Sequence, residues 1–192
     1  MKSLPKKMQV GLMLAACLGQ KFDAPMLKKV EKDNTLKDNF LESCVEFGFL
    51  HNYSSDQYVW AHDQIFQAAY DLIPLQKQES FHLLVGIRLL TLTLPSEMDR
   101  MIFYIVDNMN RGSKLIDDLD QKYELSKLNL EAGEKAISSS AFHSATKYLL
   151  MGLSHLGPES WEESRYNLTM RLYDAGAWLD FFHKCFDAYS GF

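Results

Sequence analysis

His62 and Asp63 are the residues whose types and position best suit chemistry, because they lie between a short apolar run and a helical pattern. Aspartate is a preferred N-cap residue, since its carboxylate accepts hydrogen bonds from the free N–H groups of the first turn. We therefore expect Asp63 to cap a helix in which apolar residues recur from Ile65 to Leu72 and which Pro74 ends. The pattern predicts an imidazole at the electropositive end of a helix, where a phosphate can bind. The alternative is a half-buried histidine bonded to the backbone, beside an aspartate that only caps.

The motifs of the common catalytic and metal sites are absent from the sequence. It contains no G-x-x-x-x-G-K-[ST] phosphate loop, no G-x-S-x-G, no H-E-x-x-H, no kinase H-R-D or D-F-G set and no paired Cys/His ligands. The remaining histidines lie on separate predicted elements, where we expect surface or packing roles: His51, His82, His143, His155 and His183. We expect no catalytic residue, no metal site, no cofactor of the chain's own and no enzymatic activity of the chain by itself.

Composition and charge favour a folded, mainly helical protein. The chain has 192 residues, of which 47% are hydrophobic, and its net charge of -5 comes from acids and bases that are interspersed. An acidic chain without a basic stripe is a poor match for nucleic acid or an anionic membrane surface, so we expect neither as a partner. The cysteines at positions 17, 44 and 185 have apolar neighbours and no metal-ligand spacing. They indicate reduced, packed thiols of a cytoplasmic protein.

The first residues allow two interpretations. Lysines, a short apolar run and the sequence LAAC at residues 14–17 resemble a bacterial lipoprotein signal, with Cys17 as the lipidated residue. The alternative is a buried helix that starts near Ser3 with Pro5 in its first turn. Gln9 interrupts the apolar run and no flexible spacer follows Cys17, which favours the buried helix.

Residues 1–74 have the order of elements of a winged-helix domain. We expect helices at residues 4–18, 23–31 and 35–47, then a hairpin of strands at residues 49–53 and 57–60, then the helix after His62. Gly19 and Gly48 follow the first and third helices as C-caps. The fold class that we predict is mainly α, with a winged-helix domain and a small β-hairpin followed by a helical-repeat arm.

The remaining residues are expected to be helical, with a connector at residues 75–113 and repeats at residues 114–192. Gly133 and Gly176 lie 43 residues apart, each after an alanine, and each precedes an alanine by 12 residues, Ala145 and Ala188. Small residues at fixed places let paired helices approach closely, as in tetratricopeptide-like arrays.

The second repeat is predicted to be incomplete, because its second helix has barely begun where the sequence stops. Its aromatic residues would then have little to pack against: Trp178, Phe181, Phe182 and Phe186. This indicates a piece of a longer protein, or one that pairs with itself there.

Five segments carry a resemblance to a known family. They are LPKKMQ at residues 4–9, LAACLGQKF at 14–22, AHDQI at 61–65, AAYDLIP at 68–74 and LNLEAGEKA at 128–136. Together they resemble the region downstream of the nucleotide-binding domain in STAND-type (AAA-like) signalling ATPases, as in multidomain sensor histidine kinases and serine/threonine kinases.

The resemblance implies a winged helix that packs against a nucleotide-binding ATPase domain, in cis or in trans, and a helical arm that binds other proteins. Residues 61–63 are similar to the Met-His-Asp motif of related apoptotic and plant immune ATPases, with Ala61 in place of Met. By that similarity His62 would contact the β-phosphate of ADP and hold the closed state, while Asp63 would fix the local backbone. ADP or ATP would thus be held only through the ATPase domain.

Two other functions remain open from the sequence. A DNA-binding winged-helix regulator would use residues 35–47 as its recognition helix, but one lysine against three acids gives that segment a charge of -2. Such a helix would be repelled by phosphates. A lipid-anchored helical-repeat scaffold is the other alternative, and it depends on Cys17.

Overall fold

The computed structural model describes residues 1, 3–31, 36 and 39–190, and it describes side chains up to residue 177 except those of residues 158 and 164. The chain is mainly α-helical and contains a three-stranded antiparallel sheet. It divides into two compact units, residues 1–112 and residues 113–192. The segment predicted as a connector, residues 75–113, therefore falls almost entirely within the first unit.

The first unit begins with the helix–strand–helix–helix–strand–strand order and continues with three further helices. Its elements are α1 (Lys6–Leu18), β1 (Lys21–Asp23), α2 (Ala24–Val30), α3 (Phe40–Glu46), β2 (Leu50–Ser54), β3 (Gln57–Trp60), α4 (Asp63–Tyr70), α5 (Gln78–Leu92) and α6 (Met98–Arg111), with short 3-10 turns η1 (Leu75–Lys77) and η2 (Pro95–Glu97). The predicted hairpin and the other predicted helices are confirmed within a few residues at each end, but the third helix begins at Phe40, five residues after its predicted start. Residues 35, 37 and 38 of the predicted third helix lie outside the described residues.

The sequence prediction missed β1, which completes the sheet. The strand order is β1-β3-β2, so the first strand pairs with the last. Lys21 lies opposite Val59, and Leu50 lies opposite Trp60 on the other side of β3. Gly48 has a φ of 70°, a conformation that glycine adopts without strain, and it reverses the chain between α3 and β2.

The core of the first unit lies between the sheet and its surrounding helices. Trp60 of β3 is buried, its indole N–H donates to the carbonyl of Gly19 at 3.0 Å, and its ring meets the Phe66 ring edge-on. Other fully buried side chains come from each of the surrounding elements: Leu12, Phe22, Met26, Leu50, Ala69, Leu89 and Ile105. Burial of this apolar surface is the main stabilising contribution.

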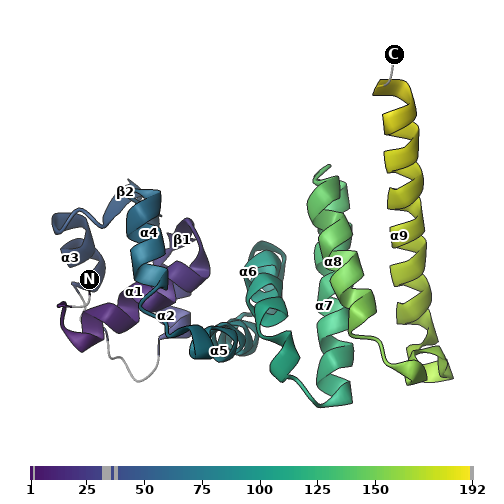
Figure 1. Cartoon of the computed structure of the whole chain (residues 1–192), viewed down its shortest axis with the longest axis horizontal. Coiled ribbons are helices and arrows are strands. Elements are labelled where there is room, and N and C mark those ends of the chain that lie inside the picture. Colours follow the sequence, from purple (N-terminus) through teal and green to yellow (C-terminus); the bar gives the residue numbers. More distant parts are fainter. Residues whose placement is uncertain (2, 32–35, 37–38, 191–192) are drawn as a thin grey trace. The chain divides into compact units, whose positions relative to one another are not determined.

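The second unit consists of η3 (Ser113–Leu115), α7 (Leu119–Ser138), α8 (Phe142–Ser154), η4 (Pro158–Trp161) and α9 (Glu163–Ser190). Within it α7 packs along α8, and α9 packs against α8 and also contacts α7 (Figure 1). A Cβ at Gly133 of α7 would lie 2.7 Å from Leu149 of α8, and one at Gly152 would lie 2.9 Å from Leu172 of α9. These glycines allow the close approach that the sequence predicted for the first repeat.

The second repeat does not take the predicted form. Residues 163–190 form one continuous helix, so no turn separates Gly176 from the segment around Ala188. A Cβ at Gly176 would meet nothing within 4 Å, in contrast to Gly133. A shared Ala-Gly pair is therefore not enough to form a second hairpin, because the close packing depends on the helix opposite. The aromatic side chains from Trp178 onward lie outside the described residues.

The close contact between α5 and α6 can be tested by adding a methyl group at Gly86. A Cβ added to Gly86 would lie 2.5 Å from the Met109 side chain and 2.8 Å from the Met109 backbone nitrogen, so α6 itself would have to move. We expect Gly86→Ala to lower the free energy of unfolding of the first unit by about 1–3 kcal/mol, as overpacking does. The matched control is Gly176→Ala, which we expect to raise helix stability by up to about 1 kcal/mol. Urea denaturation followed by residue-resolved NMR measures both, and an unchanged first unit in Gly86→Ala would contradict the packing.

Candidate functional site

His62 and Asp63 lie between β3 and α4, and the histidine is the N-cap residue. His62 has an extended backbone, and its Nδ1 accepts a hydrogen bond from the Gln64 backbone N–H at 3.1 Å. Asp63 is the first residue of α4, and its carboxylate accepts a hydrogen bond from the Gln20 side chain at 3.3 Å. The prediction that Asp63 would be the N-cap is therefore wrong by one residue, while the predicted start of a helix at this pair is confirmed.

The capping bond indicates the tautomer of the neutral ring. An imidazole that accepts through Nδ1 is neutral at that atom and carries its proton on Nε2. Both His62 and Asp63 are exposed, so the alternative of a half-buried histidine is wrong in its burial, while the bond between the imidazole and the backbone that it expected is present. The arrangement presents an N–H donor next to the first turn of a helix, whose N–H groups favour an anion.

The segment that leads to His62 is held rigidly. The Trp60 backbone N–H donates to the Gln20 carbonyl at 3.2 Å, and the Ala61 N–H donates to the Phe49 carbonyl at 3.0 Å. These bonds tie the end of β3 to both neighbouring segments. The exposed imidazole therefore extends from a fixed backbone rather than from a long loop.

A buried polar network holds the other end of α4. Tyr70, the last residue of α4, places its hydroxyl 2.9 Å from Nε2 of His82 on α5. Nδ1 of His82 lies 2.7 Å from Oδ1 of Asn108 on α6. The Asn108 amide group also donates to the carbonyl of Cys17, at the end of α1, at 3.1 Å.

The amide of Asn108 fixes the tautomer of His82. Because its NH₂ group donates to carbonyl oxygens, its Oδ1 is the acceptor and His82 donates from Nδ1. Nε2 then accepts from the Tyr70 hydroxyl, and the Arg111 guanidinium lies 3.5 Å from the same nitrogen. Burial lowers the pKa of His82 and the Arg111 charge lowers it further, against the bond to Asn108, which raises it.

From the sequence we expect a surface or packing role for His82, and its pattern does not predict the network. His82 is 2% exposed, so packing is the correct part of that expectation. The burial of His82 could have been predicted from its spacing along α5. It shares the buried face of that helix with Val85, Gly86 and Leu89. Its partners come from other helices, and the spacing within α5 does not identify them.

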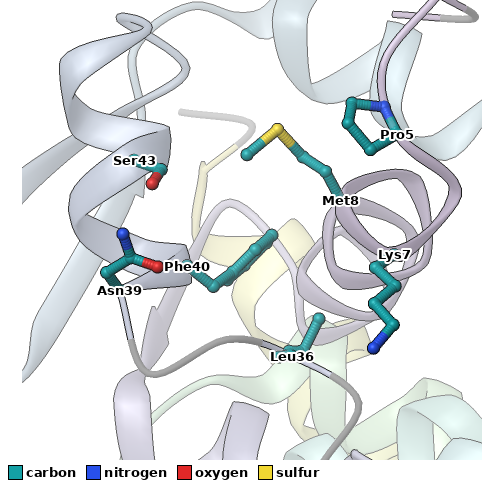
Figure 2. Close-up of a pocket in the computed structure, with 7 residues that line it drawn as sticks. All are labelled: Pro5, Lys7, Met8, Leu36, Asn39, Phe40 and Ser43. Carbon is teal, nitrogen blue, oxygen red and sulfur yellow. The ribbon is translucent and has the colours of Figure 1, made fainter.

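A separate hollow of about 150 Å³ lies between α1 and α3. Met8 and Phe40 extend into it, with Lys7, Asn39 and Ser43 around them (Figure 2). The Phe40 ring lies over Gly11, where a Cβ would come within 2.4 Å of it. With an apolar interior and one cation in its lining, the hollow suits a small apolar group and offers no acid–base pair.

Two of the cysteines are packed as the sequence predicted. Cys17 and Cys44 are buried free thiols, and burial raises the pKa of each to about 12. Among the residues that the structure describes, no group of three or more His, Cys, Asp or Glu side chains could hold a metal ion. Over the same residues, no helix has the length and apolar character needed to cross a bilayer.

The lowered pKa of His82 predicts that the first unit loses stability in mild acid. As the pH falls through about 6.5, the unfolded chain takes up a proton on His82 that the folded chain resists, so the contribution present above that pH is lost below it. We expect the free energy of unfolding to fall by up to about 1.4 kcal/mol per pH unit from this group. His82→Gln should flatten the slope, as measured by residue-resolved hydrogen exchange at several pH values.

The matched control is His143→Gln, at an exposed position of the second unit. It removes an imidazole but leaves the network of Tyr70, His82 and Asn108 intact. An equal flattening of the slope in both variants would contradict the role given to His82.

Comparison with known proteins gives one informative match. The chain is 35% identical over 120 residues to the hybrid signal transduction histidine kinase G of Dictyostelium discoideum, and the match covers 54% of this chain and 4% of that protein. The chain thus spans a small fraction of this relative's length. No protein-family model matches the chain, and no solved structure does. Slightly more than half of this chain is thus similar to a short segment of a signal-transduction protein.

Proposed function

We propose that this chain is a non-catalytic regulatory and protein-interaction module of a cytoplasmic STAND-type signalling ATPase. In it, a winged-helix domain contacts the nucleotide-binding domain, in cis or in trans, and a tetratricopeptide-like arm binds other proteins. The similarity to part of a large signalling kinase supports a module within a longer protein. ADP or ATP is bound by the ATPase domain, and His62 and Asp63 of this chain sense it.

The topology of the first unit supports a winged helix. The order α1, β1, α2, α3, β2, β3 and the strand order β1-β3-β2 are those of that domain. The pairing of α7 with α8 through Gly133 supports a helical hairpin at the start of the arm. The continuous α9 departs from a tetratricopeptide repeat, so the resemblance is limited to the first hairpin.

The observation that carries the proposal is the exposed His62, whose Nδ1 is occupied by the helix cap. The remaining ring nitrogen is a donor, and no hydrogen-bond partner for it lies within the described part of the chain. A neighbouring domain that holds a nucleoside diphosphate could place a phosphate oxygen there, where the first turn of α4 adds a favourable partial charge.

The structure argues against a DNA-binding use of the first unit. The helix in the place of a recognition helix, α3, carries Glu42 and Glu46 on its exposed side and contains no lysine or arginine. Phosphate contacts provide most of the non-specific affinity for DNA, and these carboxylates oppose them. In the folded chain Cys17 belongs to the core of α1, as a buried-helix interpretation of the first residues requires.

Reconstitution with the phosphate-loop ATPase domain of the parent protein tests the role of His62. A hydrogen bond to a charged group contributes about 1.5–3 kcal/mol, so we expect His62→Ala to release ADP about 10–100-fold faster. His62→Ser separates capping from sensing, because serine still caps the helix but lacks the imidazole. It should release ADP as fast as His62→Ala while keeping α4 intact.

The matched control is His51→Ala, which removes an exposed histidine of β2 in the same unit. Release of ADP is measured with a fluorescent analogue by stopped flow. If His62→Ala and His51→Ala release ADP at the same rate as the unchanged chain, the proposed contact does not exist.

A further inference from the structure

Three aromatic side chains form an exposed cluster on the second unit. Trp161 of η4 is 54% exposed, and Tyr166 and Tyr173 of α9 are each 50% exposed. The Trp161 ring is stacked on Tyr173 with 5.7 Å between centroids and lies 6.2 Å from Tyr166. Aromatic residues at this exposure, held in mutual contact, are typical of binding surfaces rather than of solvated helix faces.

Carboxylates adjoin the aromatic residues in the sequence, two of them on α9 and Glu162 just before it. Glu163 lies three residues before Tyr166, Asp174 directly follows Tyr173, and Glu162 directly follows Trp161. At 100° per residue Glu163 and Asp174 fall about 20° apart on the helix and about 60–100° around it from the two tyrosines. All three acids are exposed.

The basic residues of this region are already used elsewhere. The Arg165 guanidinium pairs with Asp120 at 2.9 Å and with Glu159 at 3.4 Å, and Arg171 pairs with Glu134 at 2.6 Å. Over the described residues, neither Glu162, Glu163 nor Asp174 has an ion-pair partner. The surface therefore combines exposed aromatic rings with an excess of negative charge.

Elsewhere in the same unit, an aromatic ring and nearby carboxylates hold cationic side chains. The Tyr123 ring has the Lys127 ammonium 4.6 Å from its centroid and the Arg165 guanidinium 5.2 Å away. Each cation is also paired with a carboxylate of α7, Lys127 with Glu124 at 2.7 Å and Arg165 with Asp120 at 2.9 Å. A ring and a neighbouring carboxylate on one helix thus hold a cation here.

We infer that the exposed cluster is a docking surface for an arginine-bearing segment of a partner protein. The surface consists of Trp161, Glu162, Glu163, Tyr166, Tyr173 and Asp174. A guanidinium can stack on the aromatic rings and pair with the acids at the same time, which an ammonium does less well. Nucleic acid does not fit, because the carboxylates repel phosphates. The inference rests on the proposed role of the second unit as a protein-binding arm.

Fluorescence anisotropy with the full 192-residue chain tests the inference. The probes are labelled peptides of one flexible sequence that carry arginine, lysine, the neutral isostere citrulline, or glutamate at the same positions. We expect the arginine peptide to bind at least about tenfold more tightly than the citrulline and glutamate peptides. The lysine peptide should be intermediate, and affinity should fall as salt is raised.

Variants separate the surface from the net charge of the chain. Trp161→Ala should weaken arginine-peptide binding about fivefold or more. The exposed double variant Glu163→Gln/Asp174→Asn should do the same and reduce the salt dependence, with the fold checked by circular dichroism. The control for the double variant is Asp117→Asn/Glu131→Gln, which removes two exposed charges of the same unit outside the surface defined above. The control for Trp161→Ala is Leu150→Ala, which removes an exposed apolar side chain of α8. Both controls should bind as the unchanged chain does.

Two results would overturn the inference. If the arginine and citrulline peptides bind equally tightly, the surface does not recognise a cation. If both double variants lose the same affinity, the binding depends on the net charge of the chain and not on this surface. Preferential binding of the glutamate peptide would retain a protein-binding arm with another ligand. None of these results bears on ADP release from the reconstituted ATPase, so the sensing role of His62 stands or falls separately.

Discussion

Asn108 forms hydrogen bonds that bring several helices of the first unit to one point. From α6 it donates to the last turn of α1 and accepts from His82 of α5, which in turn accepts from Tyr70 at the end of α4. Each member is satisfied by the next, which is the condition under which a buried polar network stabilises one arrangement rather than weakening the core. The position of α4 depends on this chain of bonds at one end and on the sheet at the other.

The consequence for the candidate site is a fixed helix with an exposed start. At its N-terminus, α4 follows directly on Trp60 and Ala61, whose backbone bonds join β3 to the segments on both sides. At its C-terminus, Tyr70 is bound within the protein. Under the proposed function, His62 contacts the nucleotide at one end of α4, while Tyr70 at the other end is hydrogen-bonded to α5 and through it to α6. A displacement of α4 on nucleotide binding would therefore change how it packs on these two helices.

Local patterns were enough to predict most helices but not the sheet or the cap. The hairpin of β2 and β3 is adjacent in sequence and has turn residues between its strands. By contrast, β1 has three residues and forms only because β3 is brought beside it. Asp63 is the better N-cap by residue type, but after the backbone bonds of Trp60 and Ala61 the extended residue that caps the helix is His62. Tertiary contacts thus determine that His62 and not Asp63 is the N-cap. They also determine the partners of His82, which come from other helices.

The second unit shows the same limit in a repeat. Gly133 packs on Leu149 because α8 follows α7 after a short turn, and a contact between neighbouring helices can be inferred from spacing. Gly176 has the same local sequence and no neighbour within reach of a Cβ, since α9 continues without a turn. Tyr166 and Tyr173 on the same helix are half exposed, and each has a ring contact with Trp161 of η4. Under the inferred docking role, these half-exposed rings and the exposed carboxylates of Glu163 and Asp174 form the surface that a basic partner would cover.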